Sequence, residues 1–329
     1  MPAIYVSDAI HPDALHTLSE LGTVYLGYGA EAVEYETISD KIDAVMLRAE
    51  IFDAQKINSS PKLKIIARHG VGMDNVDLDA ATRAGIWVTN TPGSNSRAVA
   101  EHVFALLLSL ARRTPYGVQA TGQGLWSEAK PQMLGFELHG KRLGLLGYGS
   151  ISRMVHSIAA GFGMEILVHD PFVADGEINS AGATALDFSS LISQSDVLSL
   201  HLPLTKSTFE IISTQALSAM KQGSILINTS RGGLVNEAAL CEALRTGHLL
   251  GAGLDVLQSE SIDMKNPLPH SILAAAHLPN LVLTPHVAGQ SAEAFLSAGL
   301  QACESISTAL KGETPSGALN HAALAATNY

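Results

Sequence analysis

The stretch LGLLGYGSISR, residues Leu143–Arg153, decides the fold prediction for this chain. Its apolar start is typical of a buried strand, Gly147 permits a tight turn, and Gly149 lets the backbone approach a phosphate group closely. A helix is expected to begin directly afterwards, so that its free amides and its dipole face the bound anion. Ser152 stands where a third glycine usually allows close helix–strand packing, and we expect its small side chain to be tolerated. The stretch therefore predicts a dinucleotide-binding βαβ unit.

An acidic residue at the end of the next predicted strand identifies the cofactor. Asp170 follows ILVH about twenty residues beyond the loop, where a carboxylate accepts hydrogen bonds from ribose hydroxyls. A carboxylate there repels a 2′-phosphate, and no lysine or arginine lies between Pro171 and Leu191 to bind one. A glycine turn alone is also typical of a strand–helix junction without a ligand. With Asp170 in register, the sequence predicts NAD in preference to NADP.

The composition excludes several classes of protein. A chain of 329 residues with 47% hydrophobic residues is long enough for two domains with well-buried cores. Its net charge of −11 argues against a nucleic-acid partner, which requires a basic surface. The most apolar run, residues 103–111, is too short to span a bilayer, and the N-terminal MPAIYVSD lacks the basic region of a signal peptide. We therefore expect a protein without membrane or nucleic-acid contacts.

Cysteine usage points to the compartment. The only cysteines are Cys241 and Cys303, which form no C-x-x-C pair. A disulfide framework or a cysteine-based zinc site is therefore not expected, and two lone thiols fit a reducing compartment. The sequence predicts a cytoplasmic protein with no bound metal.

Short apolar runs alternate with helical patterns along the whole chain. Such alternation requires helical crossovers and predicts an α/β fold with mostly parallel sheets. A long helix over about Ser96–Arg113 is expected to join two units, and residues 114–142, with Trp126, are predicted to carry little regular structure. The expected strands are Ala3–Val6, Ile42–Leu47, Leu63–Ala67 and Ile86–Thr89 in the first unit, and Leu143–Leu146, Glu165–His169, Asp196–Leu200, Ser224–Asn228, Gly253–Leu257 and Leu281–Thr284 in the second.

Four chemically useful side chains follow the later strands. Arg231, Asp255, Glu260 and His286 fall at or just beyond predicted strand ends, and in open α/β sheets ligands bind at that edge. An arginine binds carboxylates, an acid tunes a neighbouring pKa, and a histidine carries protons near neutral pH. Taken singly, Arg231 also fits a structural ion pair, Glu260 a solvated loop acid and His286 a surface residue. Their convergence beside a dinucleotide loop favours a catalytic set.

Other polar residues receive less specific interpretations. His102 is expected to have a structural role near the joint between the units, and His201 to line the nicotinamide side without taking part in the chemistry. His270 and His277, seven residues apart in a loop, make no convincing metal site. Arg48 fits two roles equally, contact with the distal end of a substrate or simple exposure.

Seven blocks of the sequence together resemble one family. They are ARHGVGMDNVDLDAATRAGIWVTNTPG (67–93), AVAEHVFALLLSLAR (98–112), the loop at 143–153, HLPLT (201–205), INTSRGGLVNEAAL (227–240), GAGLDV (251–256) and TPHVAG (284–289). In this order they are similar to the D-isomer-specific 2-hydroxyacid dehydrogenases, which are NAD-dependent, and the similarity covers nearly the whole chain. The sequence departs from the pattern at Ser152 and at LQSESIDMKNPLPH (257–270), where the family has an acidic residue followed by Glu and Pro.

The resemblance implies two Rossmann-like, doubly wound parallel-sheet domains separated by a cleft. Residues 1–98 with 287–329 would form a discontinuous substrate domain, and residues 99–286 the NAD-binding domain. The catalytic residues would be Arg231, Glu260 and His286, and the substrate would contact Val71, Gly72, Arg231 and His286. The predicted cofactor contacts are Gly147, Gly149, Ser150, Ile151, Asp170, His201, Pro203, Thr208, Thr229, Ser230, Arg231, Asp255, His286 and Gly289.

The expected activity is hydride transfer between NAD(H) and a small D-2-hydroxy acid or 2-keto acid, with His286 as proton donor or acceptor. One alternative is a phosphoglycerate dehydrogenase-like activity, although the chain leaves no room for the regulatory domain of that enzyme's long form. Another is an NAD(H)-sensing binding protein of the same fold. Family analogy also implies a homodimer formed by the helix at 98–111 and the segment 114–142. The loops near 48–52, 69–75 and 93–97 leave the substrate's identity open.

Overall fold

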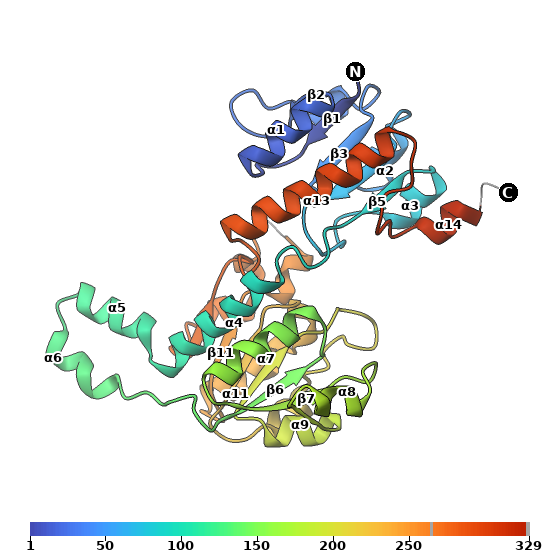
Figure 1. The fold of residues 1–329 in the computed structure, drawn as a ribbon. Helices are drawn as coiled ribbons and strands as arrows, with labels where there is room; N and C mark the ends of the chain where they lie inside the picture. Colours follow the sequence, from blue (N-terminus) through green and yellow to red (C-terminus); the bar gives the residue numbers. More distant parts are fainter. Residues whose placement is uncertain (264–265, 327–329) are drawn as a thin grey trace. The chain divides into compact units, whose positions relative to one another are not determined.

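The computed structural model of the chain describes residues 1–263 and 266–326 (Figure 1). The chain divides into two compact units: Met1–Asn95 with Gln290–Tyr329 form unit 1, and Ser96–Gly289 form unit 2. The predicted domain boundaries at 98/99 and 286/287 each lie three residues from these divisions. The last residues of the predicted substrate domain, 327–329, lie outside the described residues.

Unit 1 is built on a five-stranded sheet of order β2-β1-β3-β4-β5, in which neighbouring strands run parallel. Helices α1 and α13 pack on one face of the sheet, and α2 and α3 supply side chains to the core on the other. The elements are β1 (Ala3–Val6), α1 (Pro12–Leu21), β2 (Thr23–Leu26), β3 (Ala44–Leu47), α2 (Ala54–Asn58), β4 (Ile65–Arg68), α3 (Leu78–Arg83), β5 (Trp87–Thr89), α13 (Ala292–Leu310) and α14 (His321–Ala326).

A distant segment of the chain covers the open edge of this sheet. Ala318 forms an antiparallel bridge with Thr89 of β5, and the Leu319 amide donates to the carbonyl oxygen of Val88 at 2.8 Å. The Asn320 side chain is 4% exposed; it accepts a hydrogen bond from the Val88 amide and donates to the carbonyl oxygen of Ile86. The unpaired backbone groups of β5 are thereby partly satisfied, which protects an edge strand from pairing with another chain.

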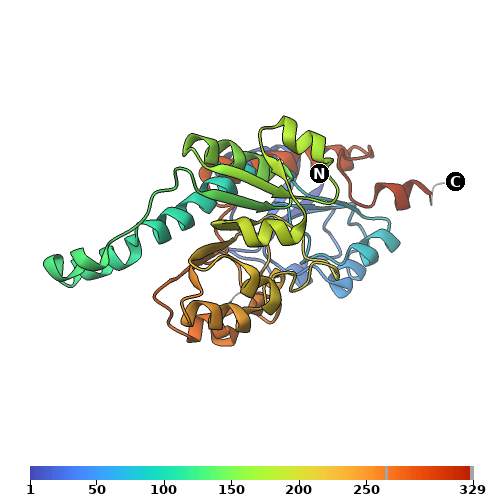
Figure 2. The ribbon, with the colours of Figure 1, turned by 90° about the horizontal axis from the view of Figure 1, so that it is seen from below.

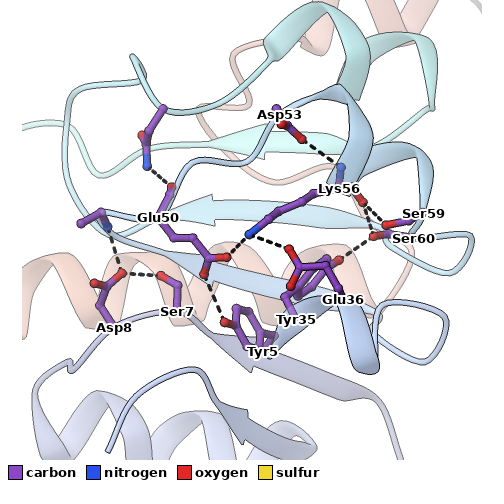
Figure 3. A network of polar contacts seen from close by, with 12 residues as sticks. Tyr5, Ser7, Asp8, Tyr35, Glu36, Glu50, Asp53, Lys56, Ser59 and Ser60 are labelled. Atoms are coloured by element: carbon purple, nitrogen blue, oxygen red, sulfur yellow. Dashed lines mark hydrogen bonds and ion pairs between the residues drawn. The ribbon is translucent and has the colours of Figure 1, made fainter. Parts of the chain in front are cut away.

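A polar network fixes the loop that follows β3 (Figure 3). The Glu50 carboxylate accepts a hydrogen bond from the Tyr5 hydroxyl at 3.1 Å and pairs with the Lys56 ammonium. Lys56 also lies 3.2 Å from a carboxylate oxygen of Glu36. Burial raises the pKa of Tyr5, so its hydroxyl stays protonated and remains a donor. The side-chain amide of Asn75 completes the network by donating to the backbone carbonyl oxygen of Glu50 at 2.7 Å.

Arg48 begins this loop and is half-buried rather than simply exposed. Its backbone amide donates to the Ser7 hydroxyl oxygen at 3.0 Å, and its guanidinium lies 4.7 Å from the centre of the Phe295 ring. A guanidinium over an aromatic ring is held by a cation–π interaction. Contact between Arg48 and a substrate stays a prediction.

Unit 2 carries a seven-stranded parallel sheet of order β12-β11-β10-β9-β6-β7-β8, with helices on both faces (Figure 2). The chain enters at β6, runs outward to β8 and then returns to β9, so the order reverses between β6 and β9. Ligands bind at such a reversal in doubly wound sheets. The elements are α4 (Ser96–Ala111), α5 (Thr114–Gly122), α6 (Trp126–Ala129), β6 (Arg142–Leu146), α7 (Ser150–Gly161), β7 (Glu165–His169), α8 (Asp175–Ser180), β8 (Thr184–Ala185), α9 (Phe188–Gln194), β9 (Val197–Leu200), α10 (Thr214–Ala219), β10 (Ser224–Asn228), α11 (Glu237–Arg245), β11 (Leu249–Leu254), α12 (Ile272–Ala275) and β12 (Leu281–Leu283).

The two faces of this sheet have separate cores. Helices α4 and α7 pack on one face through Leu107 and Val155, which are fully buried. Helices α9, α10 and α11 pack on the other through Leu191, Leu217 and Leu240. The structure confirms the predicted α/β fold with two parallel sheets. Within residues 1–263 and 266–326, no helix is both long enough and apolar enough to cross a bilayer.

Two of the secondary-structure predictions are wrong. The strand expected at Gly253–Leu257 is β11, Leu249–Leu254, and its glycines belong to the strand because α4 approaches closely: a Cβ on Gly253 would lie 2.9 Å from the Cβ of Leu106. The segment 114–142 contains helices α5 and α6 although little regular structure was expected. Arg113 turns the chain with a φ of 52°, and Pro115 suits the first turn of α5. The edge strands β2 and β8 were not predicted.

Ser152 provides a stability prediction. The residue is fully buried in α7, and among the described residues its hydroxyl oxygen has no hydrogen-bond partner. A buried hydroxyl without a partner costs free energy, so Ser152→Ala should raise the free energy of unfolding by about 1 kcal/mol. Chemical denaturation followed by circular dichroism measures the change.

Ser195 is the matched control. It is also fully buried in unit 2, but its hydroxyl donates to the Leu191 carbonyl oxygen at 2.6 Å. Ser195→Ala should therefore lower the free energy of unfolding by about 1 kcal/mol. A loss of stability in both variants would contradict the interpretation of Ser152.

Candidate active site

The loop between β6 and α7 has the shape that a phosphate group requires. Gly147 adopts a φ of 93°, and a Cβ there would lie 2.6 Å from the carbonyl oxygen of His201. Gly149 precedes α7 in extended backbone; among the residues that the structure describes, no side chain caps the helix, and a Cβ on Gly149 would meet open space. The first amides of α7, from Ser150 and Ile151, are therefore available for an anion at the positive end of the helix dipole.

Asp170 stands at the end of β7 beside this loop. One carboxylate oxygen accepts a hydrogen bond from the Tyr148 amide at 2.7 Å, and the other accepts one from the Phe172 amide at 2.8 Å. The side chain is half-buried, and each carboxylate oxygen has a second lone pair with which it can accept a hydroxyl hydrogen. The backbone of the glycine loop thus orients the acid that the sequence analysis assigned to the ribose.

A buried carboxylate shapes the backbone that carries His286. Asp255 is 1% exposed, and its two oxygens accept hydrogen bonds from the Thr284 hydroxyl at 2.5 Å, the Val287 amide at 2.9 Å and the Ala288 amide at 2.7 Å. Within this turn His286 adopts a φ of 54°, in the left-handed region that costs a non-glycine residue free energy. Asp255 therefore has an internal role, and its predicted contact with the cofactor stays a prediction.

Glu260 and His286 form a direct pair. The Nδ1 atom of His286 lies 2.8 Å from a carboxylate oxygen of Glu260, whose other oxygen accepts a hydrogen bond from the Leu257 amide at 3.0 Å. Glu260 is 12% exposed and His286 44%. An ionised carboxylate only accepts hydrogen bonds, so Nδ1 carries the hydrogen and Nε2 is left to exchange a proton with a ligand.

Arg231 lies on a loop adjacent to the one that carries Glu260. It follows β10, where the Asn228 side-chain amide donates to the Arg231 carbonyl oxygen at 2.8 Å and the Arg231 guanidinium donates to the Ser230 carbonyl oxygen at 2.7 Å. A Cβ on Gly232 would lie 2.0 Å from the carbonyl carbon of Leu257. Only glycine permits this approach, so the Arg231 loop and the Glu260 loop are in backbone contact.

The remaining predicted cofactor residues follow β9, β10 and β12, whose carboxyl ends share one edge of the sheet. Burial lowers the pKa of His201 to about 4, which keeps its imidazole neutral near neutral pH. The Thr208 hydroxyl donates to the Pro203 carbonyl oxygen at 2.7 Å, and the Ser230 hydroxyl donates to the Leu200 carbonyl oxygen. The full set at this edge is His201, Pro203, Thr208, Thr229, Ser230 and Gly289.

The two predicted substrate contacts outside unit 2 lie in the loop after β4. Val71 is 38% exposed, and its carbonyl oxygen accepts a hydrogen bond from the Asn90 side chain at 2.8 Å. Gly72 follows it in the same loop of unit 1. No group of three or more His, Cys, Asp or Glu residues is arranged to hold a metal ion within the part of the chain that the structure describes.

Two residues near the site had no role in the sequence-based prediction of catalysis. The His102 Nε2 atom lies 2.9 Å from the Thr284 hydroxyl, so α4 supports the turn that carries His286. The Glu237 carboxylate, at the start of α11, accepts a hydrogen bond from the Gln258 amide at 2.6 Å. The sequence NEAAL marks Glu237 as a first-turn helix residue, but nothing in it indicates the distant Gln258.

Comparisons with known proteins place the chain in a family. Residues 104–288 match the NAD binding domain of the D-isomer specific 2-hydroxyacid dehydrogenases. The chain belongs to this family. It is 36% identical to D-3-phosphoglycerate dehydrogenase of Mycobacterium leprae, over 97% of this chain and 59% of that protein. It is also 36% identical to glyoxylate reductase of Aeropyrum pernix, over 97% of this chain and 96% of that protein.

A solved structure shows the same likeness. D-lactate dehydrogenase from Aquifex aeolicus, in complex with NAD and lactic acid, superposes with a TM-score of 0.81 at 28% identity. The alignment covers 94% of this chain and 96% of that one. This chain spans about three fifths of the length of the phosphoglycerate dehydrogenases that it matches.

Replacing Gly232 tests the backbone contact between the Arg231 loop and the Glu260 loop. In Gly232→Ala the added methyl group would meet the backbone of Leu257 and Gln258, 2.0 and 2.2 Å away, which no side-chain rotation relieves. The free energy of unfolding of the variant should be at least about 2 kcal/mol lower than that of the parent chain. Calorimetric or chemical unfolding measures this loss.

Gly161→Ala is the control for Gly232→Ala. Gly161 ends α7 with open space around a Cβ and no positive φ. Alanine is favoured over glycine in a helix, so this variant should be neutral or slightly more stable. Equal stability of the two variants would contradict the backbone contact inferred at Gly232.

Proposed function

We propose that this protein is an NAD-dependent dehydrogenase that interconverts a small D-2-hydroxy acid and the corresponding 2-keto acid. The observation that carries the proposal is the 2.8 Å contact between Glu260 and His286 in the unit that holds the dinucleotide loop. A paired acid and imidazole is the arrangement that proton transfer near neutral pH requires. Family membership supports the same reaction class.

The residues of unit 2 fit a dinucleotide. Gly147 and Gly149 shape a turn that admits phosphate, the α7 amides of Ser150 and Ile151 suit its negative charge, and Asp170 is oriented to accept ribose hydroxyls. NAD bound there supplies the hydride chemistry. A carboxylate at position 170 disfavours a 2′-phosphate, so we expect NAD to be preferred over NADP.

His286 is the proposed proton carrier. The Nδ1 hydrogen of His286 is bonded to Glu260. Nε2, the other ring nitrogen, is therefore the atom that exchanges a proton with the substrate oxygen. The left-handed backbone at His286, fixed by Asp255, sets the direction of the ring. In the reductive direction His286 donates its Nε2 proton to the oxygen of the keto group, and the neutral ring remains hydrogen-bonded to Glu260.

Arg231 is the proposed partner of the substrate carboxylate. Its planar guanidinium matches the geometry of a carboxylate and offers it a positive charge. The same charge polarises the adjacent carbonyl group toward hydride addition. In unit 1 we assign the amides of Val71 and Gly72 to carboxylate binding, because the loop after β4 resembles the corresponding loop of the family.

The first test combines a substrate panel with one substitution. We expect the protein to oxidise NADH with at least one of glyoxylate, hydroxypyruvate, pyruvate, 3-phosphohydroxypyruvate, and branched or aromatic 2-keto acids. His286→Ala should lower kcat by about 10²–10⁴-fold, since it removes general acid–base catalysis, and change the Kd for NADH less than about threefold. Absorbance at the nicotinamide band and fluorescence titration measure the two quantities.

His270→Ala is the control, because His270 is exposed in the same unit and is assigned no role. It should retain the kcat and the NADH affinity of the parent chain. Loss of NADH binding in His286→Ala would contradict its role as proton carrier. NADH binding without turnover of any panel member would favour the alternative of an NAD(H)-sensing protein, and exclusive use of 3-phosphohydroxypyruvate would favour the phosphoglycerate dehydrogenase-like activity.

We further propose that the protein is a cytoplasmic homodimer. Cys241 and Cys303 are both free and buried, and the location is proposed because unpaired thiols fit a reducing compartment. The support for the dimer is the arm formed by residues 112–137, which projects from unit 2 with α5 and α6 (Figure 1). Several large apolar side chains of this arm are exposed: Val118 (73%), Leu125 (42%), Trp126 (67%) and Leu134 (87%). A second copy of the chain would bury such a surface.

Sedimentation equilibrium tests the dimer. The expected mass is twice the 34.5 kDa of the chain. Trp126→Glu should weaken association by at least about tenfold, because a charge replaces a large apolar side chain within the interface. Leu300→Glu, at a residue 43% exposed on α13, should leave the mass unchanged. A monomeric parent chain would contradict the proposal.

A further inference from the structure

Glu237 is a buried carboxyl group that the proposed reaction does not use. It is the first residue of α11 and only 5% exposed. The helix is already capped, because the Asn236 side chain accepts a hydrogen bond from the Ala239 amide at 2.9 Å. An acidic residue in the first turn of a helix is favourable but is normally solvated. The burial of Glu237 therefore calls for a contact beyond the helix.

That contact is the backbone amide of Gln258. One carboxylate oxygen of Glu237 accepts this hydrogen bond at 2.6 Å, across 21 residues of sequence. Gln258 opens the short 3₁₀ helix Gln258–Ser261, the segment that carries Glu260. A buried acceptor that takes up a backbone hydrogen favours one position of that amide, so Glu237 fixes the start of this segment.

Glu237 and Glu260 hold two consecutive amides of the same loop. Glu260 accepts from the Leu257 amide at 3.0 Å, and Glu237 accepts from the next amide in the chain, that of Gln258. The second oxygen of Glu260 is the one that contacts His286. A rotation of the Gln258 peptide would therefore move Glu260 relative to the imidazole.

The electrostatics agree with this arrangement. The pKa of Glu237 lies above its usual value, chiefly because the carboxyl group is buried; the hydrogen bond from Gln258 opposes this shift, and the nearby negative charge of Glu260 adds to it. In the described part of the chain, Arg231 precedes Gly232, which contacts the same loop, and Asp255 lies 3.6 Å from the His102 Nε2 atom at the turn that carries His286. Two acids are thus held close together at one loop, and the amide hydrogen bond that each accepts offsets part of the electrostatic cost.

We propose that Glu237 is a positioning residue, which orients Glu260 toward His286 by holding the Gln258 amide. The inference rests on the proposed function, in which the Glu260–His286 pair carries the proton. It deepens that function by assigning a further group, outside the catalytic set, to the geometry of the pair. Glu237 itself acts through the backbone of Gln258 rather than on the reacting atoms.

Kinetic measurements on two variants test the inference. Glu237→Ala leaves the Gln258 amide without its acceptor, and kcat per NADH-binding site should fall by at least about tenfold, with the Kd for NADH within about twofold of the parent value. Glu237→Gln keeps an oxygen acceptor and should retain kcat within about threefold. Counting the sites by NADH titration corrects kcat for any unfolded fraction of the protein. If Glu237 had only a structural role, Glu237→Ala would lower the number of NADH-binding sites and leave kcat per site unchanged.

A second measurement does not depend on turnover. Proton–carbon NMR titration of the histidine rings, with the His286 signal assigned by its absence from His286→Gln, follows the imidazole directly. Weakening the contact with Glu260 destabilises the imidazolium, so the midpoint of His286 should fall by at least about 0.5 pH unit in Glu237→Ala. Glu260→Ala should shift it in the same direction.

Glu242→Ala is the matched control, since Glu242 is an exposed acid of the same helix that pairs with Arg245 at 3.1 Å. It should change neither kcat nor the His286 midpoint. An unchanged His286 midpoint in Glu237→Ala overturns the inference, whether or not the protein turns over a substrate. A parent chain that turns over no panel member, with the midpoint shift still present, overturns the proposed reaction and leaves the positioning role standing.

Discussion

The carboxylate of Asp255 fixes the geometry on which the rest of the site depends. It is withdrawn from solvent at the end of β11 and accepts hydrogen bonds from two successive amides and one hydroxyl of the segment that follows β12. These contacts satisfy a buried charge and bend the backbone into the left-handed conformation at His286, which costs about 1–3 kcal/mol for a non-glycine residue. The direction of the imidazole is therefore set by an internal interaction, before any ligand is bound.

Backbone proximity provides the second constraint. Gly232 brings the loop of Arg231 against Leu257 and Gln258, and Gly147 brings the phosphate loop against the backbone of His201. In both places a side chain would occupy space taken by main-chain atoms, which cannot move aside as a side chain can. The groups expected to bind carboxylate, to carry a proton and to hold the cofactor are therefore positioned by rigid strand ends of one sheet.

Much of this arrangement follows from the sequence, because parallel strands present their carboxyl ends at one edge. That rule brings Arg231, Glu260 and His286 to the same edge of unit 2, and the structure pairs the last two directly. The rule does not specify which side chains bond to which backbone amides, so the internal role of Asp255 and the contact of Glu237 with Gln258 were not foreseen. Both depend on loop conformations that no local pattern encodes.

The misplaced strand has a related cause. Gly251 and Gly253 resemble turn residues in the sequence, but in β11 they make room for Leu110 and Leu106 of α4. A glycine selected by a neighbouring helix cannot be distinguished, in one sequence, from a glycine that makes a turn. The short edge strands β2 and β8 escaped prediction because none of their residues is buried, so their hydrophobic pattern is weak.

The placement of α13 has a consequence for biosynthesis. This helix supplies Ala302, Cys303 and Ile306 to the core beside β1, β3 and β4, and the Cys303 thiol donates to the carbonyl oxygen of Ala14 across 289 residues of sequence. Unit 2 is continuous, whereas one face of the unit 1 sheet is covered only in part, by α1, until α13 leaves the ribosome. The dinucleotide-binding unit can thus complete its core during synthesis, while the first-made strands wait longest for their partner and are the segment most exposed to aggregation.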